Sequence, residues 1–147
     1  MILHALHRDR PTSWVYVPQL LERVERFCRE RQTDTDPGTL RKAIMQDFTA
    51  DNPQMLVLIA IEGSEIKGHL LAVMCSWFGR KFSLAMQIEC DRHVGDGIMT
   101  AGWEQLKDWT TAQGGRKIKC EALTPALARL YRRFGLRNKR ITLEVEV

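Results

Sequence analysis

The chain has 147 residues, of which 44% are hydrophobic, and carries a net charge of +4 from 22 basic and 18 acidic side chains. This length and apolar content fit a single domain over residues 1–147 and leave no room for a second. The longest apolar run, Met55 to Ile61, is too short to cross a bilayer and the amino terminus lacks a signal-peptide pattern, so we expect a cytoplasmic protein without a membrane partner.

The amino-terminal third predicts one strand followed by two helices. The strand covers Ile2 to His7, Pro18 opens the first helix, and Asp36 with Pro37 forms the N-cap and first turn of the second. Apolar residues repeat at helical spacing in both helices, at Leu20, Leu21, Val24, Phe27 and Cys28 and then at Leu40, Ile44 and Phe48.

The middle of the chain predicts an antiparallel meander of three strands. Met55 to Ile61 reads as a strand buried on both faces, and Gly63-Ser64 turns the chain back. Ile66 to Ser76 forms the returning strand, and Gly79 supplies the turn into a third strand from Lys81 to about Ile88.

The last third predicts two helices that alternate with strands. The first helix presents Met99, Trp103, Leu106 and Thr110 and stops at Gly114-Gly115. A strand over Arg116 to Leu123, a helix opened by Thr124-Pro125 and a closing strand over Ile141 to Val147 follow. The fold class is therefore α/β (α+β), with a mixed, mainly antiparallel sheet and about four helices.

A glycine turn, Gly95-Asp96-Gly97, lies between the third meander strand and the helix after it. The first N–H groups of a helix have no partner within the helix and carry the positive end of its dipole, so such a turn can bind an anion. The spacing does not fit a dinucleotide fingerprint, because Thr100 stands where a third glycine is needed, and it lacks the Gly-Lys-Ser/Thr of a P-loop.

Two motifs resemble those of the GNAT acetyltransferases. Arg92-His93-Val94-Gly95-Asp96-Gly97 is similar to the Arg/Gln-x-x-Gly-x-Gly/Ala pattern of that family, and Ala128 to Leu136 is similar to its Leu-Tyr-x-x-x-Gly-Phe helix. The resemblance implies a GNAT-like fold and transfer of an acetyl group from acetyl-CoA to a primary amine of a small molecule or protein. It also implies cofactor contacts at Met86, Gln87, Arg92, Val94, Gly95, Asp96, Gly97 and Ile98.

The resemblance implies roles for three side chains. Tyr131 matches the proton donor to the departing thiolate, and Glu89 or Glu121 would act as the base for the amine. Tyr131 also belongs to the apolar stripe of Leu127, Leu130 and Phe134, so a core role stays open. Arg92 is interpreted either as a phosphate ligand or as an ordinary rim residue.

Other polar and aromatic residues have less specific interpretations. His69 lies in a predicted strand, where a structural role is favoured over proton transfer. Trp77, Trp103 and Trp109 would either line an acceptor pocket or pack in the core, and packing is favoured. The four cysteines have no CxxC or zinc spacing, so we expect buried free thiols and no metal site.

An alternative hypothesis is a catalytically silent GNAT-like protein. Val94 stands where the family often has a basic residue, and Asp96 places a carboxylate where phosphates would bind. The short layout and Trp109 to Gly114 resemble GNAT-like proteins of tailed bacteriophages, which would imply virion partners. Only one predicted strand follows Gly135 where the family usually closes with two, so a homodimer could supply the missing part of the acceptor wall. A nucleic-acid partner is not expected, because no recognition motif is present and the basic excess is small.

Overall fold

The computed structural model describes residues 1–31, 33–139 and 144–146. Its elements follow the predicted order. The predicted closing strand over 141–147 falls largely outside the described residues, and Glu144, Val145 and Glu146, which are described, form no strand. The elements are β1 (Ile2–Ala5), α1 (Pro11–Arg31), α2 (Pro37–Thr49), β2 (Met55–Glu62), β3 (Glu65–Trp77), β4 (Arg80–Cys90), α3 (Asp96–Ala112), β5 (Ile118–Cys120) and α4 (Pro125–Arg133).

The five described strands form one sheet in the order β1-β2-β3-β4-β5. The first three pairings are antiparallel, and β5 joins β4 in parallel. The mixed, mainly antiparallel sheet with four helices in the described residues confirms the expected fold class.

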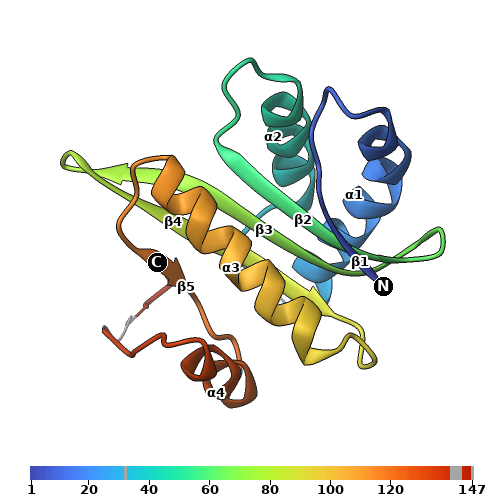
Figure 1. Ribbon diagram of the computed structural model, residues 1–147. Coiled ribbons are helices and arrows are strands. Elements are labelled where there is room, and N and C mark those ends of the chain that lie inside the picture. The colour runs from blue at the N-terminus through green and yellow to red at the C-terminus, as the bar shows by residue number, and fades with distance from the viewer. Residues whose placement is uncertain (32, 140–143, 147) are drawn as a thin grey trace.

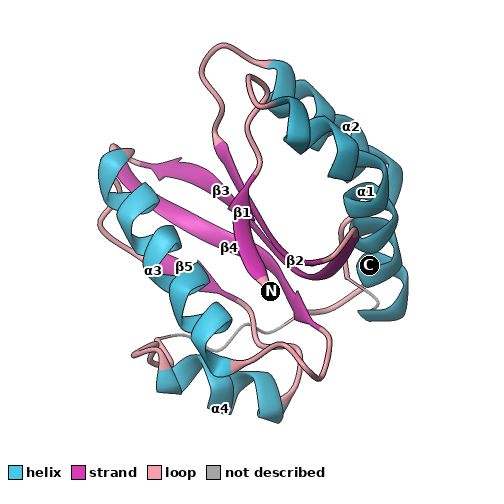
Figure 2. Ribbon diagram, turned by 45° about the vertical axis from the view of Figure 1, so that its right-hand side comes forward, coloured by secondary structure: helices cyan, strands magenta, loops and turns pink. Residues whose placement is uncertain are grey.

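Helices cover both faces of the sheet, as Figures 1 and 2 show. Helices α1 and α2 lie on one face and α3 on the other, with α4 on the side of α3. The first face is filled by Leu20, Val24, Leu40 and Ile44 against Val57, Ile59 and Leu71, and the second by Trp103 and Leu106 against Leu58, Leu70, Ala72 and Ala85. Complete burial of one such side chain stabilises the fold by roughly 1.5–3 kcal/mol. The positions of these side chains therefore determine which face of each strand packs against the helices.

Helix α1 begins at Pro11, so the prediction that Pro18 opens it is wrong. Pro11 occupies the first turn, where its missing N–H costs nothing, and Pro18 lies inside the helix. Val17 continues the buried face upstream of Pro18, and Ser13 is buried where its Oγ accepts the His7 N–H at 3.0 Å. These contacts favour the longer helix despite the hydrogen bond that Pro18 cannot donate.

Candidate functional site

The glycine turn leads directly from β4 into α3. The Val94 N–H donates to the Asp91 carbonyl at 3.0 Å, and the Val94 side chain is buried, so the turn is anchored at its centre. Gly95 is the N-cap of α3 without a side-chain capping bond, and the Ile98 N–H donates back to the Gly95 carbonyl at 3.1 Å. The N–H groups of Asp96 and Gly97 precede this first helical bond and are the ones a helix leaves for an external acceptor.

The two glycines of this turn are not required by the fold. Gly95 has a φ of −70°, and a Cβ added at Gly95 or Gly97 would meet no atom within 4 Å. Glycine therefore leaves bare, accessible backbone at the positive end of α3, where a phosphate can approach closely. These residues fit the pyrophosphate of a coenzyme, and Arg92 is exposed beside them.

Asp96, the carboxylate between the glycines, has a basic neighbour from α4. Its Oδ2 lies 3.5 Å from a terminal nitrogen of Arg133, and both side chains are exposed. Arg133 was not among the predicted site residues. The only sequence signal was its place in the basic last turn of the helix after Thr124.

Strand β4 has an unpaired edge beyond its contact with β5. The parallel pairing covers only Ser83 to Ala85 against Ile118 to Cys120, whereas β4 continues to Cys90. The strand therefore continues two residues past its predicted end near Ile88. The backbone of residues 86–90 has no β5 partner in the described part of the chain and can pair with an extended ligand.

A bulge at Met86 reverses the side-chain alternation of β4. The register changes from Ala72↔Ala85 to Leu71↔Gln87, so Met86 is the extra residue. Met86 and Gln87 consequently both face α1, where Met86 packs on the first cluster and the Gln87 side-chain nitrogen donates to the Val24 carbonyl at 3.4 Å. Ile88 then faces the α3 side with Ala85.

A small apolar cavity of about 50 Å³ lies between the end of β4, the start of α3 and α4. This volume holds about four waters. Tyr131 of α4 and Phe134, the C-cap of that helix, line it opposite Ile88 of β4, and Ile98 connects it to the glycine turn. Trp103 also lines it, stacked on Phe134 at 5.4 Å, and its buried indole N–H has no acceptor among the described residues.

Tyr131 lies in this cavity wall with 7% of its surface exposed. Burial, with a smaller contribution from Cys120, raises the pKa of Tyr131 to about 12. The phenol is therefore protonated at neutral pH and can donate a proton. This position fits the predicted core role, and the role of Tyr131 as proton donor stays a prediction.

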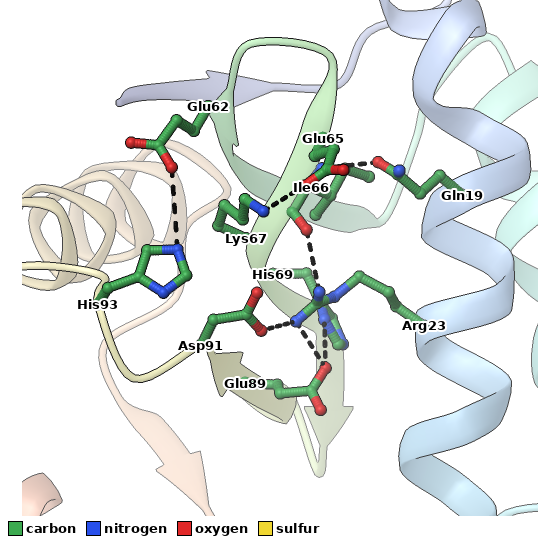
Figure 3. A network of polar contacts seen from close by, with 10 residues as sticks. All are labelled: Gln19, Arg23, Glu62, Glu65, Ile66, Lys67, His69, Glu89, Asp91 and His93. Carbon is green, nitrogen blue, oxygen red and sulfur yellow. Dashed lines mark hydrogen bonds and ion pairs between the residues drawn. The ribbon is translucent and has the colours of Figure 1, made fainter.

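Glu89 faces away from the cavity, into a polar network with α1 (Figure 3). One terminal nitrogen of Arg23 lies 3.1 Å from Glu89 Oε2 and 2.9 Å from Asp91 Oδ1, and the other donates to the Ile66 carbonyl at 2.9 Å. Burial alone would raise the pKa of Asp91, but the hydrogen bond and charge of Arg23 outweigh it and hold that pKa below its usual value. The network ties α1 to the ends of β3 and β4.

His69 is buried in the same network and is neutral at physiological pH. Its Nε2 lies 2.8 Å from Gln87 Oε1, and its Nδ1 lies 3.5 Å from Glu89 Oε2 without a hydrogen bond. Burial is the main cause that lowers the pKa of His69. This position supports the structural interpretation of His69.

Glu121, the second predicted base, is exposed one residue beyond β5. Tyr131, the end of β4 at Ile88 and Cys90, and Ile98 just after the glycine turn thus line one cavity, whereas Glu89 lies on the opposite face of the sheet. Ile88 and Arg133 are additional residues of this region that the sequence pattern did not single out, whereas Trp103, predicted to pack or to line a pocket, is buried and lines the cavity.

The described residues contain neither a membrane-spanning helix nor a cluster of metal ligands. None of their helices combines the length and apolar character needed to cross a bilayer. No three His, Cys, Asp or Glu side chains among them gather closely enough to hold a metal ion. The described cysteines are free thiols, but only Cys28 is buried, so the expectation of buried thiols is wrong for Cys75, Cys90 and Cys120.

Solved structures with the same fold include acetyltransferases. A predicted acetyltransferase of Clostridium acetobutylicum, solved with acetyl-CoA, has a TM-score of 0.76 at 13% identity, covering 99% of this chain and 95% of that one. An aminoglycoside acetyltransferase from an uncultured soil metagenomic sample has a TM-score of 0.66 at 22% identity, covering 99% and 97%. A transcriptional regulator of Bacillus halodurans has a TM-score of 0.72 at 14% identity, covering 99% and 100%.

No family model and no curated protein matches the sequence. At sequence identities of 13–22%, the similarity of this chain to these solved structures shows its fold, which is GNAT-like.

Proposed function

We propose that the protein is an N-acetyltransferase that transfers an acetyl group from acetyl-CoA to a primary amine. The observation that carries this proposal is the glycine turn: Gly95 and Gly97 serve no packing or backbone need of the chain, yet they expose amides at the start of α3. Arg92, Val94, Asp96 and Ile98 would complete the pyrophosphate site, as in the family that the motif resembles.

The chain's own groups would position the donor beside the cavity. The unpaired backbone of β4 after Met86 would hold the pantetheine arm and the acetyl carbonyl by strand-like hydrogen bonds. The coenzyme supplies the activated acetyl thioester when it is bound. Tyr131, protonated at neutral pH, would give its proton to the sulfur as the carbon–sulfur bond breaks.

The proton of the attacking amine needs a base. Glu89 and Glu121 remain the proposed bases, directly or through water. Arg23 engages Glu89 on the face opposite Tyr131, so the geometry favours Glu121, whose side chain is exposed at the end of β5. The acceptor class is a primary amine. Aminoglycosides are the first acceptors to test, because three solved structures, of two proteins, are named aminoglycoside acetyltransferases.

A matched pair of glycine variants tests the coenzyme site. Gly97 and Gly38 both stand second in their helices, α3 and α2, and neither has a crowded Cβ position. Gly97→Ala should leave the melting temperature of the free protein unchanged or slightly higher, because alanine favours helix. It should reduce the rise in melting temperature that acetyl-CoA produces, whereas Gly38→Ala should keep the full rise.

Turnover tests the chemistry separately from binding. Release of free coenzyme thiol in the presence of an amine should fall roughly a hundredfold or more in Tyr131→Phe, as is typical of a lost general acid, with the acetyl-CoA shift retained. Absence of any melting shift at millimolar acetyl-CoA would refute the proposal.

A catalytically silent role, including the virion-associated one, is the second candidate. The observation that favours it is the small cavity, which holds about four waters, together with the Arg133–Asp96 contact that joins α4 to α3 across the site. An acetyl-CoA shift without thiol release for any amine would favour this candidate. Tyr131-dependent turnover would exclude it.

A further inference from the structure

The hairpin between β3 and β4 ends in two exposed aromatic side chains. It projects beyond the rest of the sheet at the left of Figure 1. Trp77 is 69% exposed and Phe78 is 91% exposed, and their rings contact each other edge to face with centroids 5.2 Å apart. The expectation that Trp77 packs in the core is therefore wrong, and the apolar surface of this pair serves no contact within the described chain.

The turn itself holds Phe78 in an unfavourable backbone conformation. Phe78 has a φ of +48° and is the only described non-glycine residue with a positive φ, and Gly79 follows at +75°. Turns with two such residues prefer Asn-Gly or Asp-Gly, and a left-handed phenylalanine costs free energy. Because this strained turn presents a ring that is 91% exposed, the ring points to a function outside the domain.

Basic side chains without acidic partners surround the base of the hairpin. Arg80 and Lys81 follow the turn directly, and the Arg116 N–H donates to the Lys81 carbonyl at 3.2 Å. The Lys117 carbonyl accepts a hydrogen bond from the Ser83 N–H at 2.9 Å. Lys119 Nζ lies 3.9 Å from the centroid of the Phe82 ring. No ion pair is found for these five cations within the described residues, and no Asp or Glu occurs in residues 66–88 or 109–120.

We propose that this hairpin docks the protein on an anionic phospholipid surface. Phe78 and Trp77 would enter the headgroup region, where aromatic rings are favoured, and the five cations behind them would meet lipid phosphates. The earlier expectation of no membrane partner rested on the absence of a spanning segment, and peripheral docking needs none. The inference does not depend on the acetyltransferase proposal.

The observations favour a lipid surface over other occupants. A second copy docking tip to tip would bring two sets of five cations together, which repel. Single-stranded nucleic acid is bound along a basic groove that contains aromatic stacking faces, whereas these two rings stand at the apex of a projecting hairpin with the cations behind them (Figure 1). An apolar apex with cations set behind it matches the layering of a lipid interface.

Sedimentation with sucrose-loaded vesicles tests the proposal. The full chain should bind vesicles of phosphatidylcholine mixed with phosphatidylglycerol, and should bind pure phosphatidylcholine vesicles much more weakly. Phe78→Asn, which retains a favourable turn, should lower the partition coefficient roughly tenfold or more. Val15→Ser, a change at another exposed apolar residue on α1, should have no effect.

A second pair of variants tests the charge. Lys81→Gln should lower partitioning to anionic vesicles roughly fivefold, and added salt should weaken binding by the wild type. Lys42→Gln, at an exposed cation on α2, should not change it. Equal partitioning of Phe78→Asn and wild type overturns the proposal. Self-association, or oligonucleotide binding, that depends on Phe78 without vesicle binding also overturns it.

Discussion

The guanidinium of Arg133 lies 3.5 Å from the carboxylate of Asp96, so the last turn of α4 contacts the first turn of α3 beside the glycine turn. This contact brings a positive charge beside the turn, where the residue directly before Gly95 is Val94 and not a basic residue. It also links any movement of α4 to the environment of the proposed pyrophosphate site.

Replacing Asp96 should strengthen coenzyme binding. Asp96→Asn removes a negative charge near the phosphates and frees Arg133 to meet them, and an exposed charge interaction corresponds to roughly a two- to fivefold change. We expect a lower Kd for coenzyme A by titration calorimetry. Asp108→Asn, at an exposed carboxylate in the last turns of the same helix, is the control and should leave Kd unchanged. Weaker binding by Asp96→Asn would contradict the proposed phosphate position.

The stability of the fold should decline as the pH falls below about 6.5. Burial first, and the charges of Arg23 and Arg26, lower the pKa of His69, whereas Gln87 and Glu89 act in the opposite direction. The unfolded chain then binds a proton at a pH where the folded chain does not. Neutral His69 makes its full contribution to the free energy of unfolding when the pH is above the pKa of histidine in the unfolded chain. Below that pKa, the contribution falls by up to about 1.4 kcal/mol per pH unit.

Urea unfolding at about pH 7.5 and about pH 5.5 measures this effect. His69→Gln should show a shallower pH dependence. A residual slope is expected from His4, whose pKa is lowered by burial and by Arg10. The exposed His93→Gln serves as the control. An unchanged slope in His69→Gln would show that His69 is not the titrating group.

Phe78→Asn should stabilise the protein while removing its exposed ring. Asparagine adopts positive φ at lower cost than phenylalanine, so relief of strain at Phe78 should add about 1 kcal/mol. The melting temperature should rise by roughly 2–4 °C. A lower melting temperature would mean that the Trp77–Phe78 ring contact stabilises the hairpin more than the turn strains it.

Gly115→Ala should destabilise the protein. A Cβ at Gly115 would lie 2.8 Å from Thr110 Cγ2 and 3.0 Å from the Thr110 carbonyl oxygen, inside a buried corner at the end of α3. Overpacking of this kind costs about 1–3 kcal/mol. Chemical denaturation should detect the loss, and Gly38→Ala, whose Cβ would approach only the Asp36 carboxylate at 3.5 Å, should not reproduce it.

The order of elements was predictable because helical and strand periodicities are local properties of the chain. The helical spacing of Leu40 and Ile44 involves residues only four positions apart, and the turns at Gly63 and Gly79 depend on their immediate neighbours. The structure contains the helix and the two turns that these local patterns predict. The position of the glycine turn between β4 and α3 followed from the same local signals.

Properties that depend on distant residues were not predictable. Arg23 and Glu89 are 66 residues apart, and nothing near either residue indicates the ion pair that turns Glu89 toward α1. Trp77 and Trp103 are the same residue type, yet one is exposed at a hairpin tip and the other is 6% exposed beside the cavity. Pro11 and Pro18 both suit a first helical turn, and only tertiary packing upstream of Pro18 decides between them.

The bulge at Met86 separates two chemical environments along a single strand. If β4 ran through Met86 in unbroken alternation, Gln87 and Glu89 would share the face of Ser83 and Ala85 and project toward α3. The partners of Arg23 and His69 would then enter the apolar cavity, and Ile88 would take their place against α1. Deleting Met86 would instead straighten β4 and keep the observed arrangement, because Ala85 and Gln87 would then alternate regularly between the two faces.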